Sequence, residues 1–185
     1  YQMAQAGAVL IHYRAHFLKR LREMAAAVHA DFSGGREQLD LGYATVSTVA
    51  DPLAPTRDLF EAVLEHQRAH RQAELEVRQC LTGPHKDDLV VGINGLEAKT
   101  YASQGQTRTA ALSLKLGCRE IFCHDTGEWP VLLLDDVLSE LDRRRQEFVL
   151  HRITGGQVFI TCCEDDGLEG LDHGAVFHIH GGELV

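Results

Sequence analysis

The sequence predicts an α/β protein in which a mainly helical region precedes a mixed α/β region. Residues 4–29 and 56–79 are two long runs with helical character, the first with apolar side chains three and four positions apart. By contrast, residues 131–134 and 157–161 are apolar runs of strand length, and a helical stretch separates them. The composition changes near residues 80–83, so we expect a helical lobe over 1–80 and an α/β part over 81–185.

In the first region, the helix over residues 4–29 has one apolar stripe and a clear stop. Ser33-Gly34-Gly35 ends it, and residues 39–46 follow as a strand. Thr56 is a favourable N-cap for the second helix, whose later part (EHQRAHRQAE) is strongly polar, as in helices that bridge lobes or project from them. The stripe of the first helix contains six residues: Leu10, Tyr13, Phe17, Leu21, Met24 and Val28.

In the second region, Asn94-Gly95 predicts a hairpin turn between two strands. A helix follows from Ser103 to about residue 122. Residues 131–134 are all apolar, which is typical of a strand buried on both faces of an α/β sheet. Asp142 is the expected N-cap of the next helix. A strand over residues 157–161 and a terminal hairpin around Gly181-Gly182 complete the prediction.

The charge distribution argues against a generally nucleic-acid-binding surface. The net charge is −9, and no Lys or Arg occurs from Ile153 onward, whereas phosphate binding needs locally positive surface. The interpretation we favour for the basic clusters is solvated helix faces. The clusters are Arg14, Lys19, Arg20 and Arg22; Arg68, Arg71 and Arg78; and Arg143, Arg144 and Arg145.

The five cysteines do not predict a disulfide framework or a zinc site. No secretory signal or apolar run of membrane-spanning length occurs in the sequence, so reduced thiols are expected. Cys118 and Cys123-His124 do not match a zinc-binding spacing.

Two adjacent carboxylates follow the apolar run at residues 131–134. Ligands of open α/β sheets bind beyond the carboxyl ends of the strands, so Asp135 and Asp136 are expected at the mouth of the sheet. Mg²⁺ takes one or two carboxylates together with water and phosphate oxygens, which suits Asp135. Asp136 is then free to orient or deprotonate a water molecule. The alternative is a pair of capping carboxylates in a solvated turn. We call this pair the DD strand end.

A second candidate lies about 30 residues upstream, where Ser103, Gln104, Gly105 and Gln106 open a helix. We call these four residues the SQGQ element. The dipole and unpaired N–H groups of a helix N-terminus favour an anion, and glycine lets a phosphate approach the backbone. Gln104 and Gln106 add neutral donors. Taken alone, the tetrad is compatible with a plain N-cap, and its weight comes from the DD strand end downstream.

The order S-x-G-Q, helix, DD strand and S-x-L-D resembles the second half of an ABC-type ATPase head. The sequences of these motifs most resemble the RecF family, which is related to the Rad50 and SMC heads. Residues 1–80 are compatible with the inserted helical lobe of that family. The segments that carry the resemblance lie within residues 81–161 and are GPHKDDL, YASQGQTRTAALSLKL, PVLLLDDVLSELD and QVFIT.

The resemblance implies a role for each motif. The SQGQ element is then the signature motif, which reaches across a dimer to the γ-phosphate held by the partner's P-loop. Asp135 takes the Walker B magnesium position, and Asp136 takes the position of the catalytic carboxylate, where many ABC ATPases have Glu. The D-loop, which contacts the opposite subunit, is then formed by Ser139, Glu140, Leu141 and Asp142.

The chain departs from the pattern in three places. No G-x-x-x-x-G-K-[ST] loop occurs, so the resemblance implies that the P-loop half lies upstream of Tyr1 and that this chain alone is inactive. The strand after the D-loop ends Thr161-Cys162-Cys163, without the switch His. Lys86 replaces the Arg of GPHRDDL, which keeps the charge but loses bidentate geometry. The residues give no role for His85.

The function implied is an ATP-dependent switch in bacterial recombinational repair. ATP and Mg²⁺ are the expected cofactors. ATP would join two copies into a homodimer that embraces duplex DNA near a single-strand gap, and hydrolysis would release it. RecR and RecO are the implied partners, and the cytoplasm is the implied compartment. No DNA-contacting residues can be assigned.

Two alternatives stay open at the level of sequence. Asp135, Asp136 and Asp142 could serve a metal-dependent nuclease, since two-metal sites need clustered carboxylates; the SQGQ element then has no task. Alternatively, the chain could be a non-catalytic docking surface for DNA or a protein.

Overall fold

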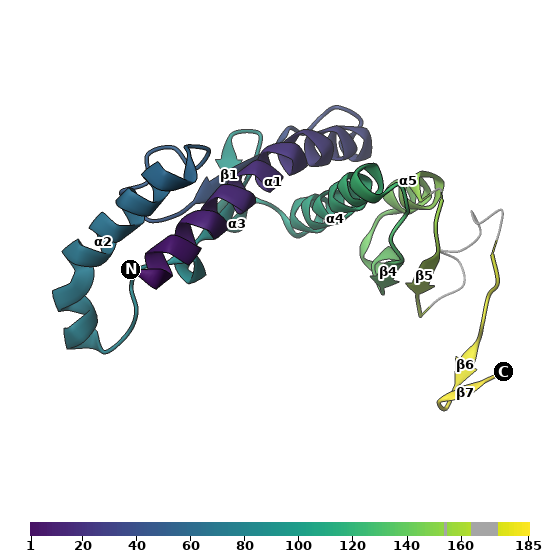
Figure 1. The fold of residues 1–185 in the computed structure, drawn as a ribbon. Coiled ribbons are helices and arrows are strands. Elements are labelled where there is room, and N and C mark those ends of the chain that lie inside the picture. Colours follow the sequence, from purple (N-terminus) through teal and green to yellow (C-terminus); the bar gives the residue numbers. More distant parts are fainter. Residues whose placement is uncertain (154, 164–173) are drawn as a thin grey trace. The chain divides into compact units, whose positions relative to one another are not determined.

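The computed structural model describes residues 1–153, 155–163 and 174–185, which form two compact units, Tyr1–Gly127 and Glu128–Val185 (Figure 1). β1 (Leu39–Ala44) and β2 (Asp88–Ile93) pair with each other across the expected boundary at residues 80–83. The two compact units therefore divide the chain at another place, and the division into a helical lobe over 1–80 and an α/β part over 81–185 stays a prediction. No helix in the described ranges is long and apolar enough to cross a membrane.

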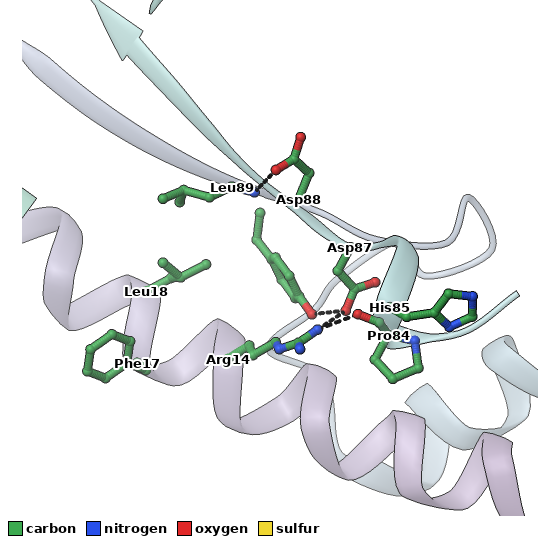
Figure 2. Close-up of a pocket in the computed structure, with 9 residues that line it drawn as sticks. Arg14, Phe17, Leu18, Pro84, His85, Asp87, Asp88 and Leu89 are labelled. Atoms are coloured by element: carbon green, nitrogen blue, oxygen red, sulfur yellow. Dashed lines mark hydrogen bonds and ion pairs between the residues drawn. The ribbon is translucent and has the colours of Figure 1, made fainter. Parts of the chain in front are cut away.

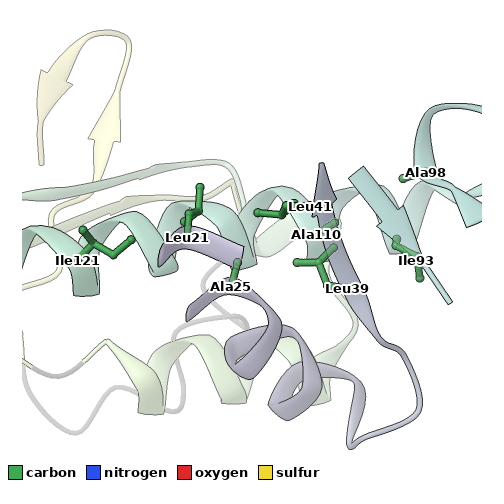
Figure 3. Close-up of a cluster of buried hydrophobic side chains, with 8 residues drawn as sticks. All are labelled: Leu21, Ala25, Leu39, Leu41, Ile93, Ala98, Ala110 and Ile121. Carbon is green, nitrogen blue, oxygen red and sulfur yellow. The ribbon is translucent and has the colours of Figure 1, made fainter. Parts of the chain in front are cut away.

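The first unit packs four helices around a small antiparallel sheet. β1, β2 and β3 (Leu96–Glu97) pair in that order, and the hairpin predicted at Asn94-Gly95 is confirmed. The helices are α1 (Gln2–Ser33), α2 (Thr56–Val77), α3 (Ala98–Tyr101) and α4 (Gln104–Thr126), with the short 3-10 turn η1 (Pro84–Lys86) after α2. The core between α1, α4 and the sheet is formed by Leu21, Ala25, Leu39, Leu41, Ile93, Ala98, Ala110 and Ile121 (Figure 3).

The apolar stripe predicted for α1 was only partly right. Leu21 and Val28 are buried, but the stripe residues Leu10, Tyr13, Phe17 and Met24 are all exposed. The buried face is instead rich in small residues: Ala4, Gly7, Ala8, Ala15 and Ala25. Small side chains let another helix approach closely, as a Cβ built on Gly117 of α4 would lie 3.1 Å from the amide nitrogen of Ala25.

The ends of the first two helices follow their local sequence with one exception. α1 ends at Ser33, and Gly34 caps it in the left-handed conformation with φ 61°, as expected for a C-terminal glycine. α2 does begin at Thr56, but its N-cap is Pro55 and has no side-chain cap bond. Thr56 as the N-cap was therefore wrong by one position. The polar character of α2 is confirmed, because Leu59, Val63 and His66 are its buried residues.

The second unit contains β4 (Leu132–Asp135), the 3-10 turn η2 (Leu138–Glu140), α5 (Arg143–Arg152), β5 (Val158–Thr161) and the hairpin β6 (Ile179–His180) with β7 (Glu183–Leu184). β4 and β5 are parallel. The prediction that β4 is buried on both faces was wrong: Leu132 and Leu134 are buried, whereas Leu133 is 70% exposed. In the described part of the chain, this sheet has only two strands.

Candidate functional site

The SQGQ element forms the first turn of α4. Ser103 is the N-cap, and its hydroxyl oxygen accepts a hydrogen bond from the amide of Gln106 at 3.3 Å. The side-chain oxygen of Gln106 accepts in return from the amide of Ser103 at 2.9 Å. This reciprocal capping box satisfies two amides that the helix itself cannot satisfy. The helix therefore begins at Gln104 because of its local sequence.

The capping box leaves part of the element open. Within the residues that the structure describes, the amides of Gln104 and Gly105 have no hydrogen-bond acceptor, and the hydroxyl proton of Ser103 has none either. Ser103 and Gln104 are exposed. These three donors lie at the positive end of the α4 dipole, where an anion is favoured.

Gln106 has a different role from the free donor expected from the sequence. Its side-chain nitrogen donates to Glu37 Oε1 at 3.0 Å, while its oxygen is used in the capping box. Glu37 in turn contacts His29 of α1, with 3.1 Å between Oε2 and Nε2. Sequence reasoning missed Glu37 and His29, because neither lies in a motif and the contacts join distant segments.

The DD strand end is fastened by Thr161 at the end of β5. The parallel register places Asp135 opposite Thr161, so the carboxyl ends of both strands meet at one edge. The hydroxyl of Thr161 donates to Asp135 Oδ1 at 2.6 Å. The amide of Asp136 donates to the Thr161 carbonyl at 3.2 Å and lies 3.0 Å from its hydroxyl oxygen.

Asp136 adopts a left-handed backbone conformation with φ 51°. This region is uncommon for residues with a side chain, although Asp and Asn tolerate it best. The turn is held by the Ser139 hydroxyl, which donates to the Asp136 carbonyl at 2.8 Å. Both carboxylates of the DD strand end are exposed. The backbone is thus fixed by main-chain and hydroxyl contacts, while the Asp136 side chain stays accessible to solvent.

The residues after the DD strand end form a tight turn into α5. Ser139 and Glu140 lie in η2, and Leu141 is buried. Asp142 is the N-cap of α5, with Oδ1 accepting from the Arg145 amide at 3.0 Å, which confirms the predicted cap. Asp142 Oδ2 also lies 3.4 Å from the Arg145 guanidinium. Because both oxygens of Asp142 are engaged, the structure does not favour it as a third metal ligand.

The GPHKDD turn is anchored by its first aspartate. Asp87, whose side chain is 2% exposed, accepts from Arg14 at 2.9 Å and from the Tyr43 hydroxyl (Figure 2). It also accepts from the Thr45 hydroxyl at 2.7 Å. Arg14 also donates to the Pro84 carbonyl at 2.5 Å. These contacts tie α1 to β1 and to the turn, and they border a cavity of about 370 Å³.

His85 and Lys86 lie exposed on the turn that this anchor holds. His85 Nε2 is 3.2 Å from the Cys80 carbonyl oxygen. Sequence reasoning singled out His85 and Lys86, but the residue with the most contacts in the motif is Asp87.

The pKa of Tyr43 leads to a test of this anchor. Burial first, and then the hydrogen bond to Asp87, raise the pKa of Tyr43 to about 12, whereas an unfolded chain titrates near 10. The unfolded state therefore loses its proton first, so this contribution to stability is present below about pH 10 and lost as the pH rises towards about 12. We expect the unfolding free energy of the wild type to fall more steeply over this interval than that of Tyr43→Phe, measured by urea titration. Equal slopes would contradict this role of Tyr43.

The arginines of α1 pair with acidic residues. Arg14 contacts Asp87, Arg20 contacts Asp125 at 2.6 Å, and Arg22 contacts Asp40 at 2.5 Å. Arg20 and then His124 hold the pKa of Asp125 at about 2. Each of the three guanidinium groups therefore has an acidic partner, whereas Lys19 of the same cluster is exposed and has no ion pair among the described residues. The arginines thus do not form an uncompensated positive surface.

The SQGQ element lies in the first compact unit, and the DD strand end and the Ser139–Asp142 turn lie in the second. The SQGQ element is held by its capping box and Glu37, and the DD strand end is held by Thr161. The structure brings Asp135, Asp136 and Ser139 together at one turn, and their proposed roles stay predictions.

Comparison with known proteins gives consistent relatives along the whole chain, although no family model matches. The DNA replication and repair protein RecF of Bacillus subtilis is 42% identical over 190 residues, which cover 100% of this chain and 50% of the relative. RecF of Desulforamulus reducens is 41% identical over 187 residues, with the same coverage of 100% and 50%.

Solved structures agree with these sequence relatives. A structure of the recombination mediator protein RecF-ATP in the RecFOR pathway superposes with a TM-score of 0.83 at 33% identity, covering 99% of this chain and 49% of that one. A second structure, described as RecF-ATPrS, gives a TM-score of 0.81 at 32% identity, with coverage of 98% and 47%. The chain therefore belongs to the RecF family of DNA replication and repair proteins, and it spans about half the length of the curated relatives it matches.

Proposed function

We propose that this chain supplies the signature motif, Walker B and D-loop part of an ABC-type ATPase head, in a protein that works as an ATP-dependent recombination mediator. The observation that carries the proposal is the start of α4, where the capping box leaves the Ser103 hydroxyl and the amides of Gln104 and Gly105 open. An exposed group of neutral donors at a helix N-terminus suits a phosphate. The likeness to RecF-ATP along 99% of the chain supports the same reading.

In this proposal the SQGQ element binds the γ-phosphate of a nucleotide held mainly by a second copy of the protein. Ser103 donates through its hydroxyl, and Gln104 and Gly105 donate through their amides. Since the donors of one copy complete the site of the other, ATP joins two copies into a dimer. The turn with Ser139, which is fixed to the Asp136 carbonyl, contacts the opposite subunit as the D-loop.

The two carboxylates of the DD strand end have different proposed roles. Asp135 would hold Mg²⁺: one of its oxygens accepts from Thr161, and the remaining lone pairs and exposed position fit a hard cation that keeps several waters. When bound, the ion neutralises charge on the phosphate oxygens. Asp136 accepts the proton of the attacking water as general base. Its fixed backbone keeps the carboxylate at the mouth of the sheet while its side chain remains accessible.

The biological role follows the family. We propose that the dimer encloses duplex DNA near single-strand gaps and that ATP hydrolysis releases the DNA. We also propose RecO and RecR as partners, because the two similar solved structures are described as proteins of the RecFOR pathway. The acidic net charge of −9 restricts DNA contacts to local basic surface.

The direct test is ATP turnover by the full-length gene product, with and without duplex DNA. We expect slow turnover that duplex DNA increases. DNA incubated with Mg²⁺ or Mn²⁺ and no ATP should stay intact. Metal-dependent cleavage without ATP would support the nuclease alternative, and DNA binding without any turnover would support a docking role.

A further inference from the structure

Behind the SQGQ element, a line of buried polar contacts runs from α4 to α1 and back. Gln106 donates to Glu37 Oε1 at 3.0 Å, and Glu37 Oε2 lies 3.1 Å from His29 Nε2. His29 Nδ1 lies 3.2 Å from the Ser113 hydroxyl. His29 and Ser113 are fully buried, and the Glu37 side chain is 16% exposed. These contacts therefore link the first turn of α4 to the interior of the first compact unit.

The ring of His29 lies between α4 and the loop after α1. Its Nδ1 faces the Ser113 hydroxyl and its Nε2 faces Glu37, so both ring nitrogens have a polar partner. The Ser113 hydroxyl also donates to the Thr109 carbonyl at 2.8 Å, which fixes it on α4.

Hydrogen bonds fix the backbone of the loop after α1, which contains Glu37. The amide of Glu37 donates to the Ser33 hydroxyl oxygen at 3.2 Å. The amides of Gly34 and Gly35 donate to the Asp31 and Ala30 carbonyls at 3.2 and 2.7 Å, which closes the C-terminus of α1. Both oxygens of Glu37 then have partners, one on α4 and one on α1. The carboxylate consequently holds Gln106 from a rigid support.

We propose that Glu37, paired with His29, is a positioning residue for the SQGQ element. Gln106 bridges Glu37 and the Ser103 amide, so fixing one end of its side chain fixes the capping box. The box sets the direction of the Ser103 hydroxyl and of the Gln104 and Gly105 amides. Glu37 acts only through Gln106 and has no contact with these open donors. This inference rests on the proposed function, because its measurable effect is ATP-driven dimerisation.

The test uses the full-length protein with Glu37→Ala and Glu37→Gln. Glu37→Ala removes the partner of Gln106, and we expect the ATP concentration for half-maximal dimerisation by light scattering to rise roughly tenfold. Glu37→Gln keeps an oxygen for Gln106 and an amide that can face His29, so it should stay within about threefold of the wild type. ATP affinity of the monomer should be unchanged in both, because the nucleotide is held by the P-loop of its own subunit.

Controls separate positioning from folding and from the proposed function itself. Glu65→Ala removes an exposed carboxylate on α2 and should dimerise as the wild type does. If Glu37→Ala lowers the thermal midpoint too far for comparison, Glu37→Asp replaces it, since it shortens the side chain by one methylene and should lose dimerisation in part. Wild-type dimerisation in whichever of these two variants folds would overturn the positioning role. A wild type that does not dimerise with ATP would instead contradict the proposed function.

Discussion

Asp136→Asn in the full-length protein should reduce ATP turnover by at least about a hundredfold, the range that a general base contributes. The change replaces a proton acceptor with a carboxamide of the same shape. Asparagine tolerates the left-handed conformation at φ 51°, and the contacts that fix this residue use its amide and carbonyl, not its side chain. The variant should therefore fold, bind ATP and dimerise while failing to hydrolyse, as measured by phosphate release.

A matched acid-to-amide change checks that result. Glu183→Gln alters an exposed carboxylate on the terminal hairpin and should leave turnover within about twofold of the wild type, as expected for a surface substitution. Turnover of Asp136→Asn close to that of the wild type would exclude Asp136 as the base. The DD strand end would then have a structural or metal-binding role only.

Ser103→Arg should prevent ATP-driven dimerisation. Ser103 is exposed at the N-cap, and its hydroxyl oxygen accepts from Gln106. An arginine would add a long cation at the start of α4 and remove the cap, whose loss costs about 1 kcal/mol. The arginine side chain would occupy the position proposed for the γ-phosphate of the nucleotide that the second copy holds. Light scattering should report monomers at ATP concentrations that make the wild type a dimer.

The control for this variant is Ser47→Arg, the same substitution at an exposed turn residue outside the SQGQ element. It should dimerise normally. Normal dimerisation of Ser103→Arg would contradict the proposed role of the SQGQ element, provided that the unfolding midpoints show both variants to be folded.

Local signals in the sequence predicted the elements that carry the proposed site. The N-cap at Ser103 was one of the two interpretations from the sequence; the capping box itself was not predicted, although Ser103 and Gln106 have the required spacing of three residues. The cap of α5 at Asp142 and the Asn94-Gly95 turn were predicted outright. Each of these structures depends on residues close together in the chain.

Contacts between distant segments could not be predicted in this way. Asp87 is anchored by Arg14, 73 residues earlier, and Gln106 contacts Glu37 across 69 residues. The buried face of α1 was also missed, because its alanines carry little hydrophobic signal while exposed Tyr13 and Phe17 carry much. For β4, apolar composition indicated burial, but burial of Leu133 depends on a covering element that its own sequence does not specify.

The measurement that tests the central proposal most directly is ATP turnover by a mixture of Ser103→Arg and Asp136→Asn in the full-length protein. Each variant alone should be inactive. If the SQGQ element of one copy completes the site of the other, a dimer of unlike subunits has one site with both lesions and one intact site. An equal mixture should then show turnover that neither variant has alone. The rate should stay below about a quarter of the wild-type rate, which random pairing would give, because the arginine at one of the two sites weakens the unlike dimer. No recovery, with an active wild type and with unlike dimers detected, would contradict a site shared between two copies.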